Sequence, residues 1–90
     1  MSKEGKLKIK KSNDSVIATL YTTDIVKAGN NRIVTLNSGG WKTSTTKKSI
    51  NRVLDMLQIP IHVFTHEKEW KIINKDGITL SFEDNKEYAY

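Results

Sequence analysis

The chain has 90 residues, of which 37% are hydrophobic and 28% are charged, and it contains no cysteine. This length suits a single domain, and the composition is too apolar for a disordered chain. The absence of cysteine excludes disulfides, thiolate catalysis and cysteine-based zinc sites, and no apolar run is long enough to predict a membrane span.

The net charge of +5 is concentrated in the central third of the chain. No acidic residue occurs between Asp24 and Asp55, and this segment contains six basic residues: Lys27, Arg32, Lys42, Lys47, Lys48 and Arg52. This asymmetry favours an anionic partner, either a phosphorylated ligand or the backbone of a nucleic acid. A solvated basic face that serves only solubility is the alternative interpretation.

The first part of the chain predicts strands. Apolar residues alternate with lysines near the start, so residues 1–12 are expected to form an edge strand or a loose arm. A β-branched strand is predicted over residues 16–28, with a bend or bulge at 22–24. The turn signal at 29–31 then predicts a hairpin with a strand over 32–36.

One helix is predicted in the middle of the chain. Apolar residues recur there at helical spacing, at Ile50, Val53, Leu54 and Leu57. Pro60 is expected to stop the helix, and the hydroxyl residues at 43–46 are candidate N-caps.

The last third predicts a meander. Strands are expected over 61–65, 70–73 and 78–82, and the Lys-Asp-Gly sequence at 75–77 is a hairpin turn signal. Residues 83–90 are a candidate tail or partner-contacting arm. The whole pattern predicts one α+β domain over 1–90: a mainly antiparallel, twisted sheet of five to six strands with one helix packed on one face.

The segment from Gly39 to Asn51 combines several features of a phosphate site. Its two glycines allow the backbone to approach a ligand closely, and its threonines surround the predicted helix start. A helix start carries unpaired N–H groups and a partial positive charge, which an acidic residue would normally complement. Lys47 and Lys48 follow instead, so an external anion is the natural complement.

Six side chains of this segment are the candidate ligand contacts: Trp41, Thr43, Thr45, Thr46, Lys47 and Asn51. Helical geometry places Lys47 and Asn51 on the same flank of the apolar stripe, where both could meet one ligand. The ring of Trp41 could stack on a nucleotide base. In the alternative interpretation, the threonines only cap the helix and Trp41 is a core or interface residue.

No catalytic or metal-binding pattern is evident. His62 and His66 lie on a predicted strand, where four residues span about 13 Å, too far for one metal ion to bridge easily. The spacing around Gly40 and Thr43 is not that of a P-loop. We therefore expect a binding protein rather than an enzyme, with no cofactor and no metal.

The run from Leu36 to Lys47, with Asn51 four residues on, resembles the central motif of a family of small bacteriophage proteins. That motif reads Gly-Gly-Trp/Tyr-x-Thr-x-Thr-Thr-Lys and opens a helix, and a Trp-containing hairpin follows it, as it does here. The resemblance covers residues 16–82. It extends to the anti-CBASS sponge proteins, which bind cyclic dinucleotides and thereby silence a bacterial immune signal.

This resemblance implies a homo-oligomer, a dimer or tetramer, that holds a ligand such as 3′,3′-cGAMP in the host cytoplasm without cleaving it. It implies phosphate contacts from the threonines and Lys47, a base or wall contact from Trp41, and a base-edge or ribose contact from Asn51. Three alternatives remain open: a small phage protein that contacts the phosphate backbone of a nucleic acid or takes over a host function, an interaction protein without a ligand, and a phosphodiesterase.

Overall fold

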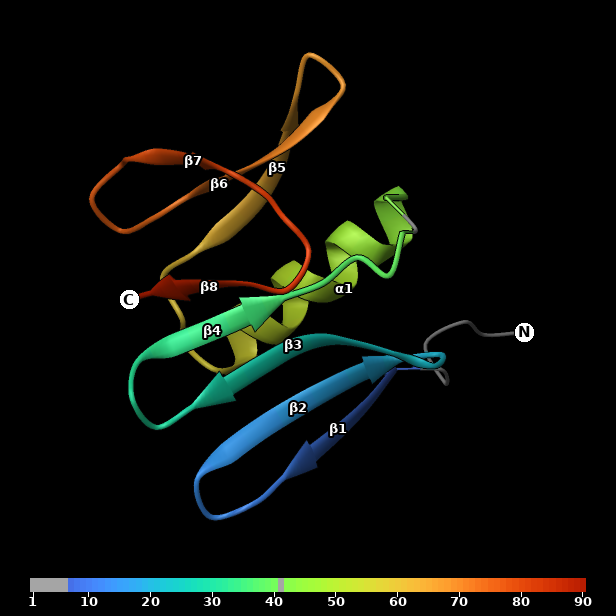
Figure 1. The fold of residues 1–90 in the computed structure, drawn as a ribbon, viewed down its shortest axis with the longest axis vertical. Helices are drawn as coiled ribbons and strands as arrows, with labels where there is room; N and C mark the ends of the chain where they lie inside the picture. Colours follow the sequence, from blue (N-terminus) through green and yellow to red (C-terminus); the bar gives the residue numbers. More distant parts are fainter. Residues whose placement is uncertain (1–6, 41) are drawn as a thin grey trace.

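The computed structural model describes residues 7–40 and 42–90. Within these ranges the chain forms one helix and two antiparallel sheets, so the α+β class and a helix packed on a sheet are confirmed (Figure 1). The elements in chain order are β1 (Leu7–Lys11), β2 (Ser15–Leu20), β3 (Thr23–Gly29), β4 (Ile33–Leu36), α1 (Ser44–Met56), β5 (His62–His66), β6 (Glu69–Ile73), β7 (Thr79–Ser81) and β8 (Lys86–Ala89).

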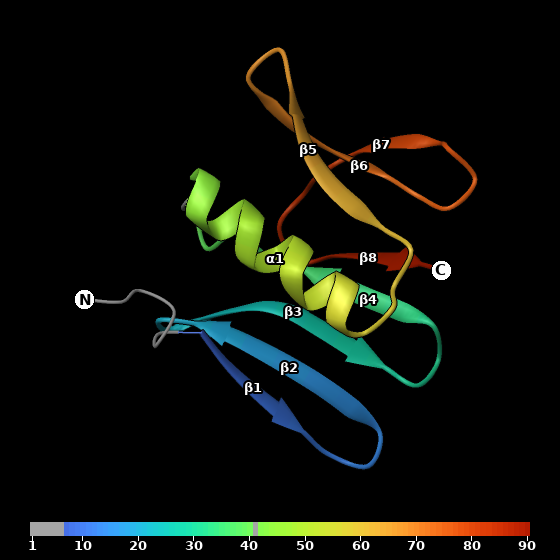
Figure 2. The same cartoon turned by 180° about the vertical axis from the view of Figure 1, so that it is seen from behind.

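The larger sheet has the strand order β1-β2-β3-β4-β8 and the smaller one the order β5-β6-β7. Helix α1 crosses one face of the larger sheet, which is seen from the helix side in Figure 2. The apolar stripe of the helix explains this packing, because Ile50, Val53 and Leu54 are all 0% exposed. The helix ends at Met56, ahead of Pro60, as predicted.

The described residues form eight strands in two sheets, more than the five to six expected in one sheet. One reason is that the segment 16–28 forms two strands, β2 and β3, rather than one bent strand. It reverses at a two-residue turn, Tyr21-Thr22, because Leu20 pairs with Thr23. Tyr21 adopts a positive φ of 58°, a conformation usually signalled by glycine or asparagine, so the sequence predicted a bend or bulge at 22–24 and not a reversal of the chain.

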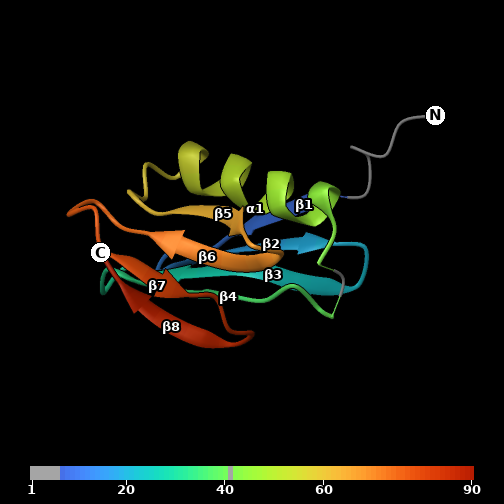
Figure 3. The same cartoon turned by 90° about the horizontal axis from the view of Figure 1, so that it is seen from above.

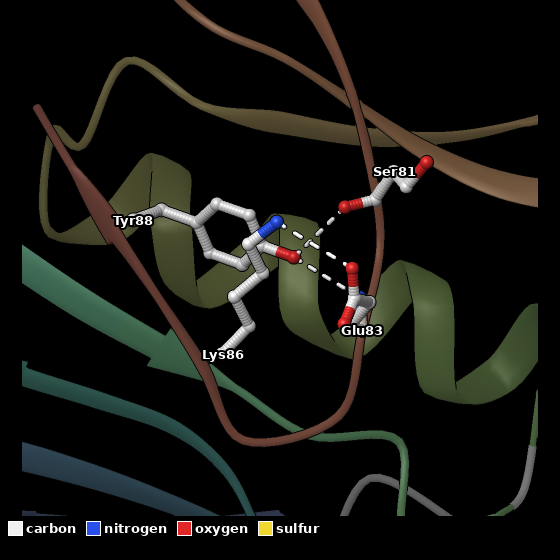
Figure 4. Close-up of polar contacts among 4 residues, drawn as sticks. All are labelled: Ser81, Glu83, Lys86 and Tyr88. Carbon is white, nitrogen blue, oxygen red and sulfur yellow. Dashed lines mark hydrogen bonds and ion pairs between the residues drawn. The ribbon is translucent and has the colours of Figure 1, made fainter.

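The second reason for the larger number of strands is the segment that was expected to be a tail. Residues 86–89 of the candidate tail form β8, which pairs with β4 and buries Tyr88. The Tyr88 hydroxyl donates to the Ser81 carbonyl oxygen and accepts from the Glu83 N–H, both at 3.0 Å (Figure 4). Lys86 reaches the Glu83 carboxylate at 3.5 Å in the same view. At the other end, residues 7–11 form the edge strand of the larger sheet.

The smaller sheet is held between α1 and β8, as Figure 3 shows. On the β5 side, Asn51 of α1 accepts from the Val63 N–H and donates to the Val63 carbonyl oxygen, both at 2.8 Å. On the β7 side, Tyr88 contacts Ser81. No helix in the described part of the chain is long and apolar enough to cross a membrane.

Candidate ligand-binding site

A pocket of about 620 Å³ lies between the β2–β3 turn, the end of β4 and the first turn of α1. Two of its lining residues, Leu20 and Ile25, are aliphatic. Ile25 is the extra residue of a β-bulge, where the pairing shifts between Ala18 and Thr19. The other lining residues all carry hydroxyl groups: Tyr21, Thr22, Thr23, Ser38, Thr43, Thr45 and Thr46.

The helix start supplies one wall of this pocket. Thr43 is the N-cap, with an extended backbone (φ −106°, ψ 164°), and its Oγ1 accepts from the Thr46 N–H at 3.3 Å. The Thr46 side chain is buried, and its hydroxyl lies 3.2 Å from the Thr43 hydroxyl. The backbone N–H groups of Ser44 and Thr45 have no partner among the described residues, and the first turn holds no acidic residue. The wall therefore combines hydroxyls with free N–H donors.

The loop before the helix is fixed by the protein itself. Ser38 is 1% exposed, and its N–H and hydroxyl both donate to the same Asp84 carboxylate oxygen at 2.8 Å. The Gly40 N–H donates to the Ser38 hydroxyl at 3.2 Å. Gly39 has a φ of 66°, and a Cβ there would lie 2.6 Å from Thr23 Oγ1. Gly39 thus permits a close approach to the β2–β3 hairpin, whereas the space around Gly40, with a φ of 83°, is open.

The structure brings three of the six predicted contacts together. Thr43, Thr45 and Thr46 all line the pocket. Lys47 and Asn51 do share a flank of α1, but this flank faces β5. There the Lys47 ammonium donates to Thr65 Oγ1 at 2.6 Å, and the Asn51 amide makes two hydrogen bonds with the Val63 backbone. Trp41 lies outside the described residues.

The basic residues of the central segment do not gather on one surface. Lys27 lies on β3, and Arg32 lies in the β3–β4 turn, where its Nε donates to the Tyr90 carbonyl oxygen at 2.8 Å. Lys42 sits over the Phe82 ring at 5.9 Å, and the other three basic side chains belong to α1. Among the described residues, no charged side chain lines the pocket. Its affinity for an anion would rest on N–H groups, hydroxyls and the helix dipole.

The histidines lie apart from this site. His62 and His66 are the ends of β5, both are exposed, and the His66 imidazole approaches the Glu67 carboxylate at 3.8 Å. In residues 7–40 and 42–90, no three potential histidine or carboxylate metal ligands cluster together.

The opposite wall of the pocket was not predicted. Three of its residues, Tyr21, Thr22 and Thr23, come from a hairpin turn that lacks the glycine or asparagine typical of such turns. Ser38 was interpreted only as part of a strand break. The glycine and hydroxyl residues at 38–46 were the only sequence signal for this pocket, and they predicted only the wall that the helix start forms.

A comparison with known protein families places the chain among phage proteins. The model of the Kyanoviridae Gp96 protein family matches residues 2–89. The chain belongs to this family. It is a small bacteriophage protein, as its resemblance to phage sequences led us to expect. No curated protein and no solved structure matches the chain.

Proposed function

We propose that this Gp96 family protein is a non-catalytic binding protein that sequesters a phosphate-containing nucleotide signal. The ligand class is a cyclic dinucleotide such as 3′,3′-cGAMP, and its capture would block the CBASS immunity of the bacterial host. The observation that carries the proposal is the 620 Å³ pocket at the acid-free start of α1. Its volume lies within the range of about 300–1,000 Å³ that is typical of small-molecule sites.

The chemistry of the lining supports phosphate as the anchor. The free N–H group of Thr45 and the hydroxyls of Thr43 and Thr45 are donors that suit phosphate oxygens, and the free N–H group of Ser44 lies next to them in the first turn of α1. The described lining residues are hydroxyl-bearing and aliphatic, and none is a histidine or a carboxylate that could act as a general base. We therefore propose binding without turnover.

The remaining predicted contacts take different roles in this proposal. Lys47 is bonded only to an exposed threonine hydroxyl, which a phosphate can replace. Asn51 makes two hydrogen bonds with the Val63 backbone and is proposed to hold α1 in position. Trp41 is proposed to stack on a base, and the protein is proposed to act as a homo-oligomer in the host cytoplasm.

Calorimetry with 3′,3′-cGAMP tests the proposal, and chromatography of the ligand after heating the protein checks that it is recovered intact. Thr45→Val keeps the side-chain shape and removes an exposed pocket hydroxyl, so it should weaken binding by about tenfold to 150-fold, the value of one lost hydrogen bond to a charged group of about 1.5–3 kcal/mol. Thr79→Val makes the same change at an exposed threonine of β7 outside the pocket and should bind as the wild type does. Absence of binding, or recovery of cleaved ligand, would contradict the proposal.

A salt titration separates this function from binding to a nucleic-acid backbone. The affinity of a backbone binder falls steeply with salt, with a logarithmic slope of about −0.9 per phosphate contacted on duplex DNA. No charged side chain among the described residues lines the pocket, and Lys47 is the only charged contact that the proposal assigns, so a shallower slope is expected for the cyclic dinucleotide. Tight binding of a short oligonucleotide with a steep slope would favour the backbone alternative.

A further inference from the structure

The β2–β3 turn places an aromatic residue at the pocket under unfavourable local conditions. Tyr21 is the first of two turn residues and has a φ of 58°, a region that L-residues with a bulky side chain rarely occupy. The side chain gains little from burial in return, since 53% of it is exposed. Backbone strain together with an exposed ring is a combination that stability alone does not favour.

The position of Tyr21 at the pocket indicates a functional reason for its strained backbone and exposed ring. Tyr21 lines the pocket beside Leu20 and opposite Thr43 and Thr45 of the helix wall. The hairpin side of the pocket carries the ring of Tyr21 and the aliphatic side chain of Leu20 next to the hydroxyls of Thr22 and Thr23, whereas the helix side has hydroxyls and no aromatic ring among the described residues. The contact between Gly39 and Thr23 holds the two sides together. A ligand with a flat ring at one end and a phosphate at the other matches this division.

We propose that Tyr21 stacks on one base of the nucleotide, in addition to the base contact proposed for Trp41, and that this base lies against the β2–β3 turn. This inference rests on the proposed function and adds the orientation of the ligand, with this base toward the hairpin and its phosphate toward α1. Stacking of a base on an aromatic side chain contributes about 1–3 kcal/mol, which corresponds to roughly fivefold to 150-fold in affinity. It requires the ring and not the phenol hydroxyl.

The experiment is calorimetry of 3′,3′-cGAMP with Tyr21→Asn and Tyr21→Phe. Asparagine tolerates positive φ, so Tyr21→Asn removes the ring without adding backbone strain and should leave the thermal midpoint equal or higher. We expect Tyr21→Asn to weaken binding at least fivefold and Tyr21→Phe to bind within twofold of the wild type.

The outcomes distinguish this inference from the proposed function. Wild-type protein that binds no nucleotide would overturn both. Loss of affinity in Thr45→Val with unchanged affinity in Tyr21→Asn would keep the proposed function and overturn the role of Tyr21. Loss in Tyr21→Phe as large as in Tyr21→Asn would also overturn it, because the hydroxyl and not the ring would then carry the contact.

Discussion

Asn51 shows how one side chain can close the edge of a sheet. In an antiparallel strand, every second residue turns its N–H and C=O groups toward the open edge, where they can pair with another chain. At Val63 both groups are taken by the amide of Asn51, which donates and accepts as a neighbouring strand would. The same bonds fix the distance between α1 and β5.

Asn51→Ala should therefore destabilise the protein. It leaves the Val63 N–H and carbonyl without their partner, and an unsatisfied group costs about 1–3 kcal/mol. For a domain of this size each kcal/mol lowers the thermal midpoint by about 4–8 °C. Thermal unfolding followed by circular dichroism measures the shift. Arg52→Ala changes the next, exposed residue of α1 and should leave the midpoint nearly unchanged, so equal midpoints for both variants would contradict this role of Asn51.

At the scale of elements, the loop before α1 is positioned by its contact with the β2–β3 hairpin. Gly39 and Gly40 both have positive φ, but only at Gly39 would a Cβ meet the Thr23 side chain, at 2.6 Å from Oγ1 and 2.8 Å from Cγ2. Alanine at either position strains the backbone by about 1–2 kcal/mol. Gly39→Ala carries the steric cost in addition and should be the more destabilising of the two.

Urea unfolding of the two alanine variants measures that difference. Thr23→Ala removes the two closest atoms, Oγ1 and Cγ2, and keeps Cβ, which lies 3.1 Å from the position of the added Cβ. When it is combined with Gly39→Ala, it should therefore recover most of the stability that Gly39→Ala loses relative to Gly40→Ala. Equal stabilities of the single variants, or no rescue by Thr23→Ala, would show that the loop yields easily and that the contact does not define the pocket.

Elements with local signals were predictable from the sequence, and those fixed by distant contacts were not. Helix α1 carried an apolar stripe and a threonine cap, and the β6–β7 hairpin carried its glycine at a φ of 79°. Strand β8 has one inward apolar residue, Tyr88, and exists through pairing with β4. The same holds for the candidate site. The wall formed by the helix start could be predicted from the local sequence, whereas the wall formed by the hairpin is brought there by tertiary packing.

At the scale of the whole molecule, hydrogen bonds from the side chains of Lys47, Asn51 and Tyr88 join the smaller sheet to the rest of the protein, beside the packing of its buried residues in the common core. Asn51 connects this sheet to α1 on the β5 side, and Tyr88 connects it to the larger sheet on the β7 side. The Tyr88 phenol is buried, and this burial raises its pKa above the usual value for tyrosine of about 10, although the hydrogen bond from the Glu83 N–H acts in the opposite direction. The junction between the sheets therefore requires a neutral phenol.

Tyr88→Phe tests this junction through the pH dependence of unfolding. At pH 8 the variant lacks both hydrogen bonds of the hydroxyl and should be less stable than the wild type by about 1 kcal/mol or more. Because the folded pKa is the higher one, the contribution of Tyr88 is complete below pH 10 and is lost as the pH rises through the folded pKa. The stability gap between wild type and Tyr88→Phe should therefore narrow between pH 8 and pH 11 in urea unfolding, while lysine titration, common to both proteins, cancels. A stability gap for Tyr88→Phe that stays constant with pH would contradict this role, because the Tyr88 phenol would then be in contact with water and not buried between the two sheets.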